Sequence, residues 1–155
     1  NSSRGQWWYN RFCMEIQIRR IDKELPLPEY KTSGAVAMDC AARIDTTIPP
    51  QGIGYVPLNF ALKPPPGHFV LMAARSSLHK RGLSIPNGVG IFDEDYCGDA
   101  DEYHAVLYNF TNEPVDIKRG ERLTQIVVLP YVKAALSEVD TLGQATRGGF
   151  GTTGK

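Results

Sequence analysis

The 155-residue chain carries 17 lysines and arginines and 17 aspartates and glutamates, so its formal net charge is zero. This length is most simply one domain, which buries roughly 70% of its unfolded surface around a single core. A neutral chain has no overall positive field, so the composition excludes a general electrostatic hold on nucleic acid or an anionic membrane, and any phosphate must be bound locally.

Cysteine usage and hydropathy indicate the compartment. The three cysteines are far apart and form no C-x-x-C pair, which suits free thiols in a reducing compartment better than a disulfide framework or a zinc site. No apolar run approaches the ~18 residues of a membrane span, and the N-terminus lacks the basic-then-apolar order of a signal peptide. The sequence therefore predicts a cytoplasmic protein with neither a membrane nor a nucleic-acid partner.

The hydrophobic pattern divides the chain into three parts. Residues 1–13 show neither alternation nor a helical period, and a clean alternating stretch opens at Met14. We interpret residues 1–13 as a leader or a cloning remnant and residues 14–140 as one β domain. Residues 141–155 are predicted to form a flexible, glycine-rich C-terminal arm.

Short alternating apolar runs predict β-strands in the central part of the chain. They are found at 14–18, 56–62, 115–117 and 125–129. Between them lie turn sequences rich in glycine and proline, which leave little room for long helices. The one helix-like piece is 76–83, with serines to cap it and Gly82 to stop it, enough for one or two turns. The pattern predicts an all-β sandwich, barrel or jelly roll with at most one short helix.

Five polar or glycine-rich constellations interrupt these strands. Each alone has an ordinary explanation, such as a capped turn or an acidic turn. In chain order they are SGAVAMDCAA (33–42), AARSSLHKRGL (73–83), PNGVGIFDEDY (86–96), RGERLTQIVV (119–128) and RGGFGTTG (147–154). Their order and content resemble the five motifs of the trimeric dUTP pyrophosphatases, the dUTPase family, and the resemblance covers nearly all of the chain from Met14 onward.

This resemblance implies a fold, an assembly and a reaction. The subunit would be a jelly roll or distorted β-barrel that assembles as a homotrimer, with each active site built from motifs of different subunits. The reaction would be hydrolysis of dUTP to dUMP and pyrophosphate, which needs a water in line with the α-phosphorus, a base for its proton and cations for the triphosphate. We therefore expect a Mg²⁺-dependent enzyme of nucleotide metabolism.

The resemblance also assigns the catalytic side chains. Asp93 matches the aspartate that activates water, Asp95 matches a structural position of the same motif, and Glu94 is expected to face solvent. Arg75 matches a phosphate-binding arginine, whose guanidinium offers a fork of donors. Gln125 matches the glutamine of the fourth motif, an uncharged group that can orient the water or a phosphate oxygen. Its place in an apolar strand also allows a purely structural, buried glutamine.

The first two motifs supply the remaining phosphate and metal contacts. Ser76 matches a phosphate-binding serine, with a hydroxyl where charge builds on phosphoryl oxygens, and Ser77 is expected to help. Asp39 matches an aspartate that lies near the metal through water and is not a direct ligand. Mg²⁺ prefers a shell of water and phosphate oxygens, so the absence of a dense carboxylate cage does not argue against it.

The third motif implies base and sugar selection. Asn87, Gly90 and Phe92 match the positions of a hairpin that receives uracil, where backbone groups would read the edge of the base. Cytosine presents the opposite donor pattern and would leave buried groups unpaired, at about 1–3 kcal/mol per group. Tyr96 matches the residue that packs under the deoxyribose and leaves no room for a ribose hydroxyl. Its alternative is an ordinary aromatic of the core.

The C-terminal tail places a large aromatic, Phe150, among glycines. Residues 149–155 satisfy the G-x-x-x-x-G-K pattern of a phosphate-binding loop, but they lack the strand-to-helix context that such a loop requires. In the dUTPase family this arm closes over a neighbour's site, and Phe150 matches the aromatic that covers the uracil ring. Arg147 precedes it by three residues where relatives usually have five, which leaves open whether Arg147 contacts phosphate.

The segment 99–108 is longer than the family pattern and carries Asp99, Asp101 and Glu102. It predicts a bulge or an extended, solvated loop on the strand after the hairpin. An acidic metal site is the less favoured interpretation.

Two other functions remain as alternatives. A dCTP deaminase shares the jelly roll and the RSSL sequence, but it needs a general-base glutamate at the position of Val106, and an apolar side chain cannot take a proton from water. The same reasoning disfavours a bifunctional enzyme. A regulatory binding protein on this scaffold is disfavoured because Asp93, Gln125 and Arg75 are all present.

Overall fold

The computed structural model of the protein describes residues 14–149, whose regular elements are β-strands and one short 3₁₀ turn. In chain order they are β1 (Gln17–Arg20), β2 (Met38–Ala41), β3 (Thr46–Ile48), β4 (Ile53–Pro57), β5 (Phe60–Lys63), β6 (His68–Ala74), η1 (Leu78–Arg81), β7 (Leu83–Ser84), β8 (Gly90–Phe92), β9 (His104–Asn109), β10 (Val115–Ile117) and β11 (Arg122–Pro130). The all-β prediction is confirmed. None of these described elements is a helix long and apolar enough to cross a membrane. The leader assigned to residues 1–13 lies outside the described part.

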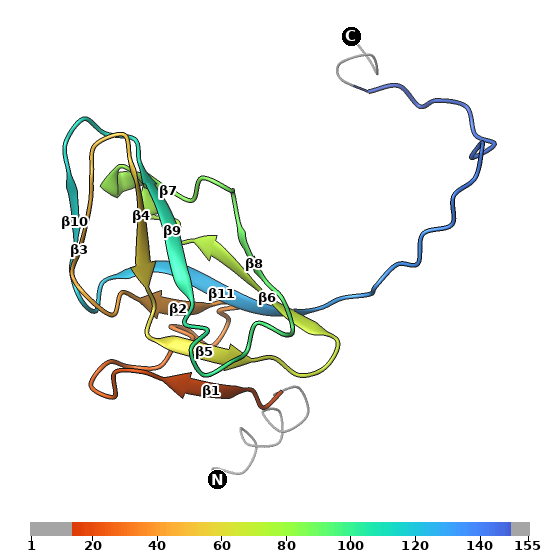
Figure 1. The fold of residues 1–155 in the computed structure, drawn as a ribbon. Coiled ribbons are helices and arrows are strands. Elements are labelled where there is room, and N and C mark those ends of the chain that lie inside the picture. The colour runs from red at the N-terminus through yellow and green to blue at the C-terminus, as the bar shows by residue number, and fades with distance from the viewer. Residues whose placement is uncertain (1–13, 150–155) are drawn as a thin grey trace.

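The strands pair antiparallel in four small sheets (Figure 1). The largest has the order β2-β11-β6-β8, and a second has the order β4-β9-β7. The pairs β1-β5 and β3-β10 complete the arrangement. Because neighbours in the largest sheet are distant in sequence, that sheet brings segments of the first four sequence constellations side by side.

A corner at Asn59 divides the alternating run 56–62, which the sequence predicts as one strand, into β4 and β5. Asn59 has a φ of 77°, a left-handed conformation that ends the strand. Its side chain fixes the corner, because Nδ2 donates to the Asp22 carbonyl at 3.0 Å and Oδ1 accepts from the Asp22 backbone N–H at 2.6 Å. The apolar alternation continues through the corner because both strands face the same core.

One hydrophobic core receives side chains from all four sheets. On β9, Ala105, Leu107 and Asn109 are buried and alternate with half-buried residues. A fully buried leucine contributes about 1.5–3 kcal/mol. The buried amide of Asn109 is satisfied, since Nδ2 donates to the carbonyls of Ile48 and Glu113 at 3.2 and 2.7 Å. This amide ties β9 to the end of β3 and to the loop before β10.

The short helix η1 forms where the sequence predicts it. Gly82 ends it with a φ of 72°, and its N–H donates to the His79 carbonyl at 3.0 Å. The predicted serine cap is wrong, because Ser77 at the N-cap position makes no side-chain capping bond. Ser76 and Ser77 are both exposed, which leaves their hydroxyls for another partner.

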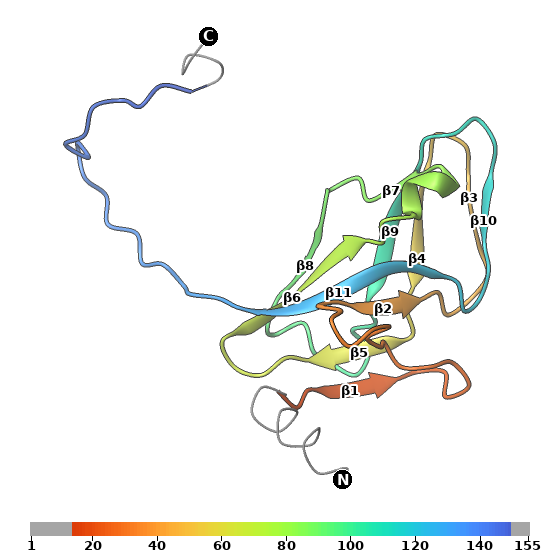
Figure 2. The same cartoon turned by 180° about the vertical axis from the view of Figure 1, so that it is seen from behind.

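The chain leaves the body where β11 ends. Residues 132–149 carry no helix or strand and extend away from the sheets (Figure 2). Apolar side chains of this segment face solvent, with exposed fractions of 93% for Val132 and 98% for Leu136. These side chains of the segment therefore do not pack against the body of the subunit.

Candidate active site

A cavity of about 430 Å³ receives the side chains of the third sequence constellation. Asn87, Gly90, Phe92 and Tyr96, which the sequence assigns to substrate binding, all line it. The other lining residues are Tyr55, Met72, Ile85, Val89, His104 and Val106. No lining side chain is a carboxylate or a lysine, so the cavity suits an uncharged, flat ligand better than a phosphate.

Local backbone chemistry builds one wall of this cavity. Gly88, with a φ of 79°, closes a turn in which its N–H donates to the Ile85 carbonyl at 3.0 Å. Gly90 then begins β8, where a Cβ would lie only 3.3 Å from the Met72 Cβ. Glycine thus lets the hairpin approach β6 closely and leaves its backbone accessible from the cavity.

Aromatic rings form the inner wall. The ring of Phe92 stacks on Tyr103 with centroids 4.0 Å apart and an interplanar angle of 7°. Tyr103 is fully buried and also contacts Phe60 at 5.0 Å. Tyr96 packs against both Phe92 and Tyr103, at 5.9 and 5.8 Å. This stack holds Phe92 and Tyr96 in place before any ligand arrives.

The Tyr96 hydroxyl stays protonated and donates a hydrogen bond. Burial raises the pKa of Tyr96, and the nearby carboxylates of Asp101 and Glu102 raise it further. The neutral hydroxyl donates to the Glu102 carbonyl at 3.2 Å. The ring, which lines the cavity, is therefore tethered at its far end.

A second cluster joins Asp39, Arg75 and Gln125 on the largest sheet. Gln125 lies opposite Asp39 on β2 and opposite Ala73 on β6, so Arg75 follows β6 directly beside them. Arg75 Nε and Arg122 Nη1 each lie 3.1 Å from Asp39 Oδ2. Two guanidinium groups around one carboxylate leave a local positive charge that suits phosphate oxygens.

Gln125 has a structural bond and a free acceptor. Its Nε2 donates to the Ala74 carbonyl at 2.9 Å, which fixes the amide orientation. With the donor end held by β6, the carbonyl oxygen is the part that can face a ligand. The two interpretations of this glutamine, structural and functional, are therefore compatible.

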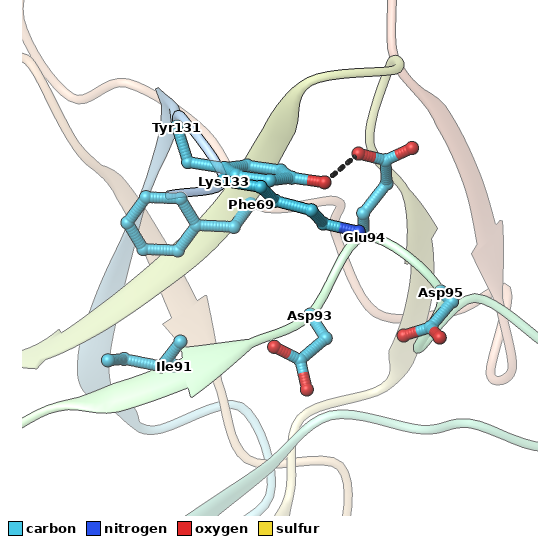
Figure 3. Close-up of a pocket in the computed structure, with 7 residues that line it drawn as sticks. All are labelled: Phe69, Ile91, Asp93, Glu94, Asp95, Tyr131 and Lys133. Carbon is cyan, nitrogen blue, oxygen red and sulfur yellow. Dashed lines mark hydrogen bonds between the residues drawn. The ribbon is translucent and has the colours of Figure 1, made fainter. Parts of the chain in front are cut away.

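Asp93 lines a different cavity, of about 510 Å³, together with Asp95 and with Tyr131 and Lys133, which follow β11 (Figure 3). It directly follows Phe92 in sequence but is not among the residues that line the aromatic cavity. Figure 3 shows the carboxylates of Asp93 and Asp95 pointing away from the hydrogen bond between Glu94 and Tyr131. Asp93 is exposed and thus open to water and substrate.

Glu94, which was expected to face solvent, is half-buried and hydrogen-bonded. Its carboxylate accepts from the Tyr131 hydroxyl at 2.5 Å and from the Gly67 backbone N–H at 2.9 Å. The Tyr131 bond, followed by the Gly67 bond, holds the pKa of Glu94 below its ordinary value. Glu94 thereby fixes the first residue after β11 to the loop that carries Asp93.

Within the described residues, the aromatic cavity and the cluster of Asp39, Arg75 and Gln125 are separate parts of the candidate site. No hydrogen bond or ion pair in residues 14–149 joins a residue of the aromatic cavity to Asp39, Arg75 or Gln125. Arg147 lies exposed on the extended segment. Phe150, the expected cover of the base, lies outside the described residues.

The long segment before β9 is an extended loop, as predicted, but it is not simply solvated. Glu102 is half-buried and accepts two hydrogen bonds from Arg43, and Asp101 Oδ2 accepts from the Gly98 N–H at 2.7 Å. No group of three or more His, Cys, Asp or Glu side chains in the described residues is placed to hold a metal. The acidic residues of this loop thus hold the loop itself.

Tyr55 and His104 are among the cavity residues that sequence reasoning did not assign to substrate binding. His104 Nδ1 lies 2.8 Å from the Glu102 carbonyl, and its ring faces the cavity beside Val106. The alternation of β9 was available as a signal, because His104, Val106 and Tyr108 occupy one face of that strand. Tyr55 gave no such signal, since it reaches the cavity only through the pairing of β4 with β9.

Comparison with known proteins gives a consistent result. A family model described as dUTPase matches residues 23–154. The deoxyuridine 5'-triphosphate nucleotidohydrolase of Dictyoglomus turgidum is 42% identical over 148 residues, which cover 91% of this chain and 99% of that protein. The enzyme of the same name from Anaeromyxobacter sp. is 39% identical over 146 residues, covering 90% of this chain and 97% of that protein.

Solved structures agree with the fold. The dUTPase from Streptococcus mutans superposes with a TM-score of 0.70 at 26% identity, over 76% of this chain and 98% of that one. The Staphylococcus bacteriophage 80alpha dUTPase, solved with dUPNHPP, gives a TM-score of 0.79 over 91% of this chain and 99% of that one. At 19% identity this second likeness concerns the fold alone.

Proposed function

The chain belongs to the dUTPase family, and from that premise we propose that it hydrolyses dUTP to dUMP and pyrophosphate. The observation that carries the proposal is the aromatic cavity, which gathers Asn87, Gly90, Phe92 and Tyr96 around an uncharged volume of about 430 Å³. A pyrimidine nucleoside fits the chemistry of such a cavity, because its base is flat and its edge can pair with exposed backbone groups of a hairpin.

Base and sugar selection follow from this cavity. Uracil would lie against the stacked ring of Phe92, with its edge read by the backbone around Gly90. Cytosine would leave backbone groups unpaired, at about 1–3 kcal/mol each. The tethered ring of Tyr96 would face the deoxyribose and leave no room for a 2′-hydroxyl.

Asp93 is the proposed base. It is an exposed carboxylate one residue beyond Phe92, so it would stand beside a nucleotide whose base lies in the cavity. A carboxylate there can take the proton of a water that attacks the α-phosphorus as pyrophosphate leaves. Asp95 and Glu94 lie in the same loop, but the bonds of Glu94 to Tyr131 and Gly67 commit it to a structural role.

The triphosphate would be held by the second cluster. Arg75 brings a guanidinium group that Asp39 already orients, and the exposed hydroxyls of Ser76 and Ser77 follow it in sequence. Gln125 would turn its carbonyl oxygen toward the attacking water. The guanidinium and hydroxyl donors would stabilise charge on phosphoryl oxygens, and neither they nor the Gln125 amide would compete with Asp93 for the proton.

Mg²⁺ is the proposed cofactor, held mainly by the triphosphate. The described residues offer no cage of carboxylates, which fits an ion that keeps water and phosphate oxygens as ligands. The closest contacts of both arginines to Asp39 are to Oδ2, so Oδ1 can accept from a metal-bound water. When bound, the ion would neutralise charge on the phosphates.

We propose a homotrimer in which different subunits complete each site. No hydrogen bond or ion pair among residues 14–149 joins the aromatic cavity to the Arg75 cluster, and the segment 132–149 exposes Val132, Leu136 and Leu142. A segment with this much exposed apolar surface gains stability by packing on another chain. Residues 141–155 would then form the arm that closes a neighbour's site, with Phe150 over the uracil and Arg147 near the phosphates.

The remaining assignments are also proposals. Cys40 and Cys97 carry free thiols, which supports a reducing compartment such as the cytoplasm. The zero net charge supports the absence of a nucleic-acid partner. A deaminase is not favoured, because Val106, at the position of its general base, lines the cavity as an apolar side chain.

One assay tests the proposed function. Pyrophosphate release would be measured with dUTP, dCTP, dTTP and UTP at equal concentrations, with and without Mg²⁺. We expect release from dUTP with Mg²⁺ and little from the other three. Ammonia from dCTP would indicate a deaminase, and tight dUTP binding without any product would indicate a regulatory protein.

A further inference from the structure

The long loop before β9 is clamped to the corner at Asn59. Arg43 Nε donates to Glu102 Oε1 at 2.7 Å, and Nη2 donates to Oε2 at 2.9 Å. The backbone N–H of Asn59 donates to the same Oε1 at 2.9 Å. The side chains of Arg43 and Glu102 are only 28% and 11% exposed, so this pair is better shielded from solvent than an ordinary surface ion pair.

The backbone next to Glu102 is fixed as well. The Tyr103 N–H donates to the Phe60 carbonyl and its carbonyl accepts from the Leu58 N–H, both at 2.9 Å. The Tyr103 ring is fully buried under Phe92. The peptide between Glu102 and Tyr103 is therefore held by side chain, backbone and ring together.

This fixed peptide holds two walls of the aromatic cavity. The Glu102 carbonyl accepts from the Tyr96 hydroxyl at 3.2 Å and from His104 Nδ1 at 2.8 Å. Both rings line the cavity. A shift of the Glu102 carbonyl would therefore displace the Tyr96 ring, which in the proposed function faces the deoxyribose.

The clamp is charged at neutral pH. Burial pushes the pKa of Glu102 up, but the hydrogen bonds from Arg43 and from the Asn59 N–H outweigh it and leave that pKa below its ordinary value. The Arg43 pKa is raised in turn, chiefly by its bonds to Glu102. Both partners are therefore ionised when the enzyme works, and the bidentate geometry is retained.

We propose that Glu102 and Arg43 are positioning residues that set the distance between Tyr96 and the sugar, and so govern the choice of deoxyribose over ribose. This inference rests on the proposed function. A steric selection against one hydroxyl depends on placement to within a fraction of an ångström, because a ring that yields makes room for the extra oxygen. The clamp prevents the Tyr96 ring from yielding.

The experiment compares kcat/KM for dUTP with kcat/KM for UTP in the full chain. Glu102→Ala should lower the ratio about tenfold or more, chiefly by improving relative use of UTP. Asp101→Asn is the matched control, because it removes a carboxylate from the same loop but not from the clamp, and its ratio should stay at the wild-type value. General destabilisation would lower both rates together and leave the ratio unchanged.

Tyr96→Phe tests the same idea without touching the clamp. It removes only the hydroxyl bond to Glu102 and keeps the ring, so thermal unfolding should not change and the ratio should fall by a smaller factor. An unchanged ratio in Tyr96→Phe and in folded Glu102→Ala would overturn the inference, and if Glu102→Ala does not fold, Tyr96→Phe alone decides. A wild-type protein that does not hydrolyse dUTP would overturn the proposed function itself.

Discussion

The aromatic cavity and the C-terminal segment are built in opposite ways. In the cavity, Phe92 lies on the buried ring of Tyr103 and Tyr96 is tied by its hydroxyl, so the walls are in place in an isolated subunit. In the segment 132–149, Leu136 is 98% exposed and no strand or helix forms. The difference teaches that the subunit preforms the walls of the aromatic cavity, whereas the segment 132–149 gains no regular structure from the same subunit; in the proposed function, assembly or ligand would order it.

The largest expected effect comes from removing the proposed general base while leaving the aromatic cavity and the C-terminal segment intact. Asp93→Asn keeps the size and hydrogen bonding of the side chain but removes the base, so kcat should fall by about 10²–10⁴-fold. Binding of a non-hydrolysable dUTP analogue should stay near the wild-type value. Calorimetric titration and pyrophosphate release measure the two quantities, and normal turnover would remove Asp93 from its assigned role.

Deleting residues 147–155 removes the proposed cover and leaves the aromatic cavity in place. We expect dUTP hydrolysis to fall about a hundredfold, since closure positions the phosphates and excludes water, while the melting temperature stays the same. Phe150→Ala should be a milder version, costing about 1 kcal/mol of stacking. A truncated protein with a normal rate on dUTP would reduce the arm to an ordinary frayed end.

Two leucine substitutions compare the contribution of the subunit core to stability with the contribution of the segment 132–149. Leu107→Ala opens a cavity in the core and should lower the free energy of unfolding by about 2–5 kcal/mol. Leu136→Ala removes an exposed side chain and should instead weaken the trimer, seen as dissociation at higher protein concentration in sedimentation velocity. A monomeric wild-type protein that is fully active would contradict the trimer, and a loss of subunit stability in Leu136→Ala would contradict the division of roles.

The smallest expected effect is a dependence on acid. The folded-state pKa of Glu102 lies below its unfolded value of about 4.3, so its stabilisation is fully present above that pH and is lost as the pH falls through the folded pKa. Denaturant unfolding of wild type and Glu102→Gln should be measured at several pH values. The difference between their free energies of unfolding should shrink as the pH falls. A difference between the two proteins that does not shrink as the pH falls below the unfolded pKa would show that the ionised clamp does not stabilise the fold.

Part of the fold was readable from local patterns. The alternation at 115–117 and 125–129 predicts β10 and β11, and Gly82 predicts the end of η1. The break at Asn59 was not readable, because a left-handed residue in an apolar run is stabilised by Asp22, 37 residues away. Alternation reports which side chains are buried and not whether one strand or two bury them.

The candidate site divides in the same way. The family resemblance of the five constellations indicated Asn87, Gly90, Phe92 and Tyr96. These four residues meet in one cavity because they lie close together in sequence on one hairpin. Their partners Tyr55 and His104 arrive through the pairing of β4 with β9, which no short motif encodes.

The sequence by itself determined the fold class and the family, because hydrophobic period is a local property of the chain and motif order is read directly along it. Only the tertiary structure decided which acidic groups are free. Glu94 and Glu102, both expected in solvent, are bound by Tyr131 and Arg43, whereas Asp93 stays exposed. The reason is physical: the role of a carboxylate depends on the donors that folding brings to it from distant parts of the chain.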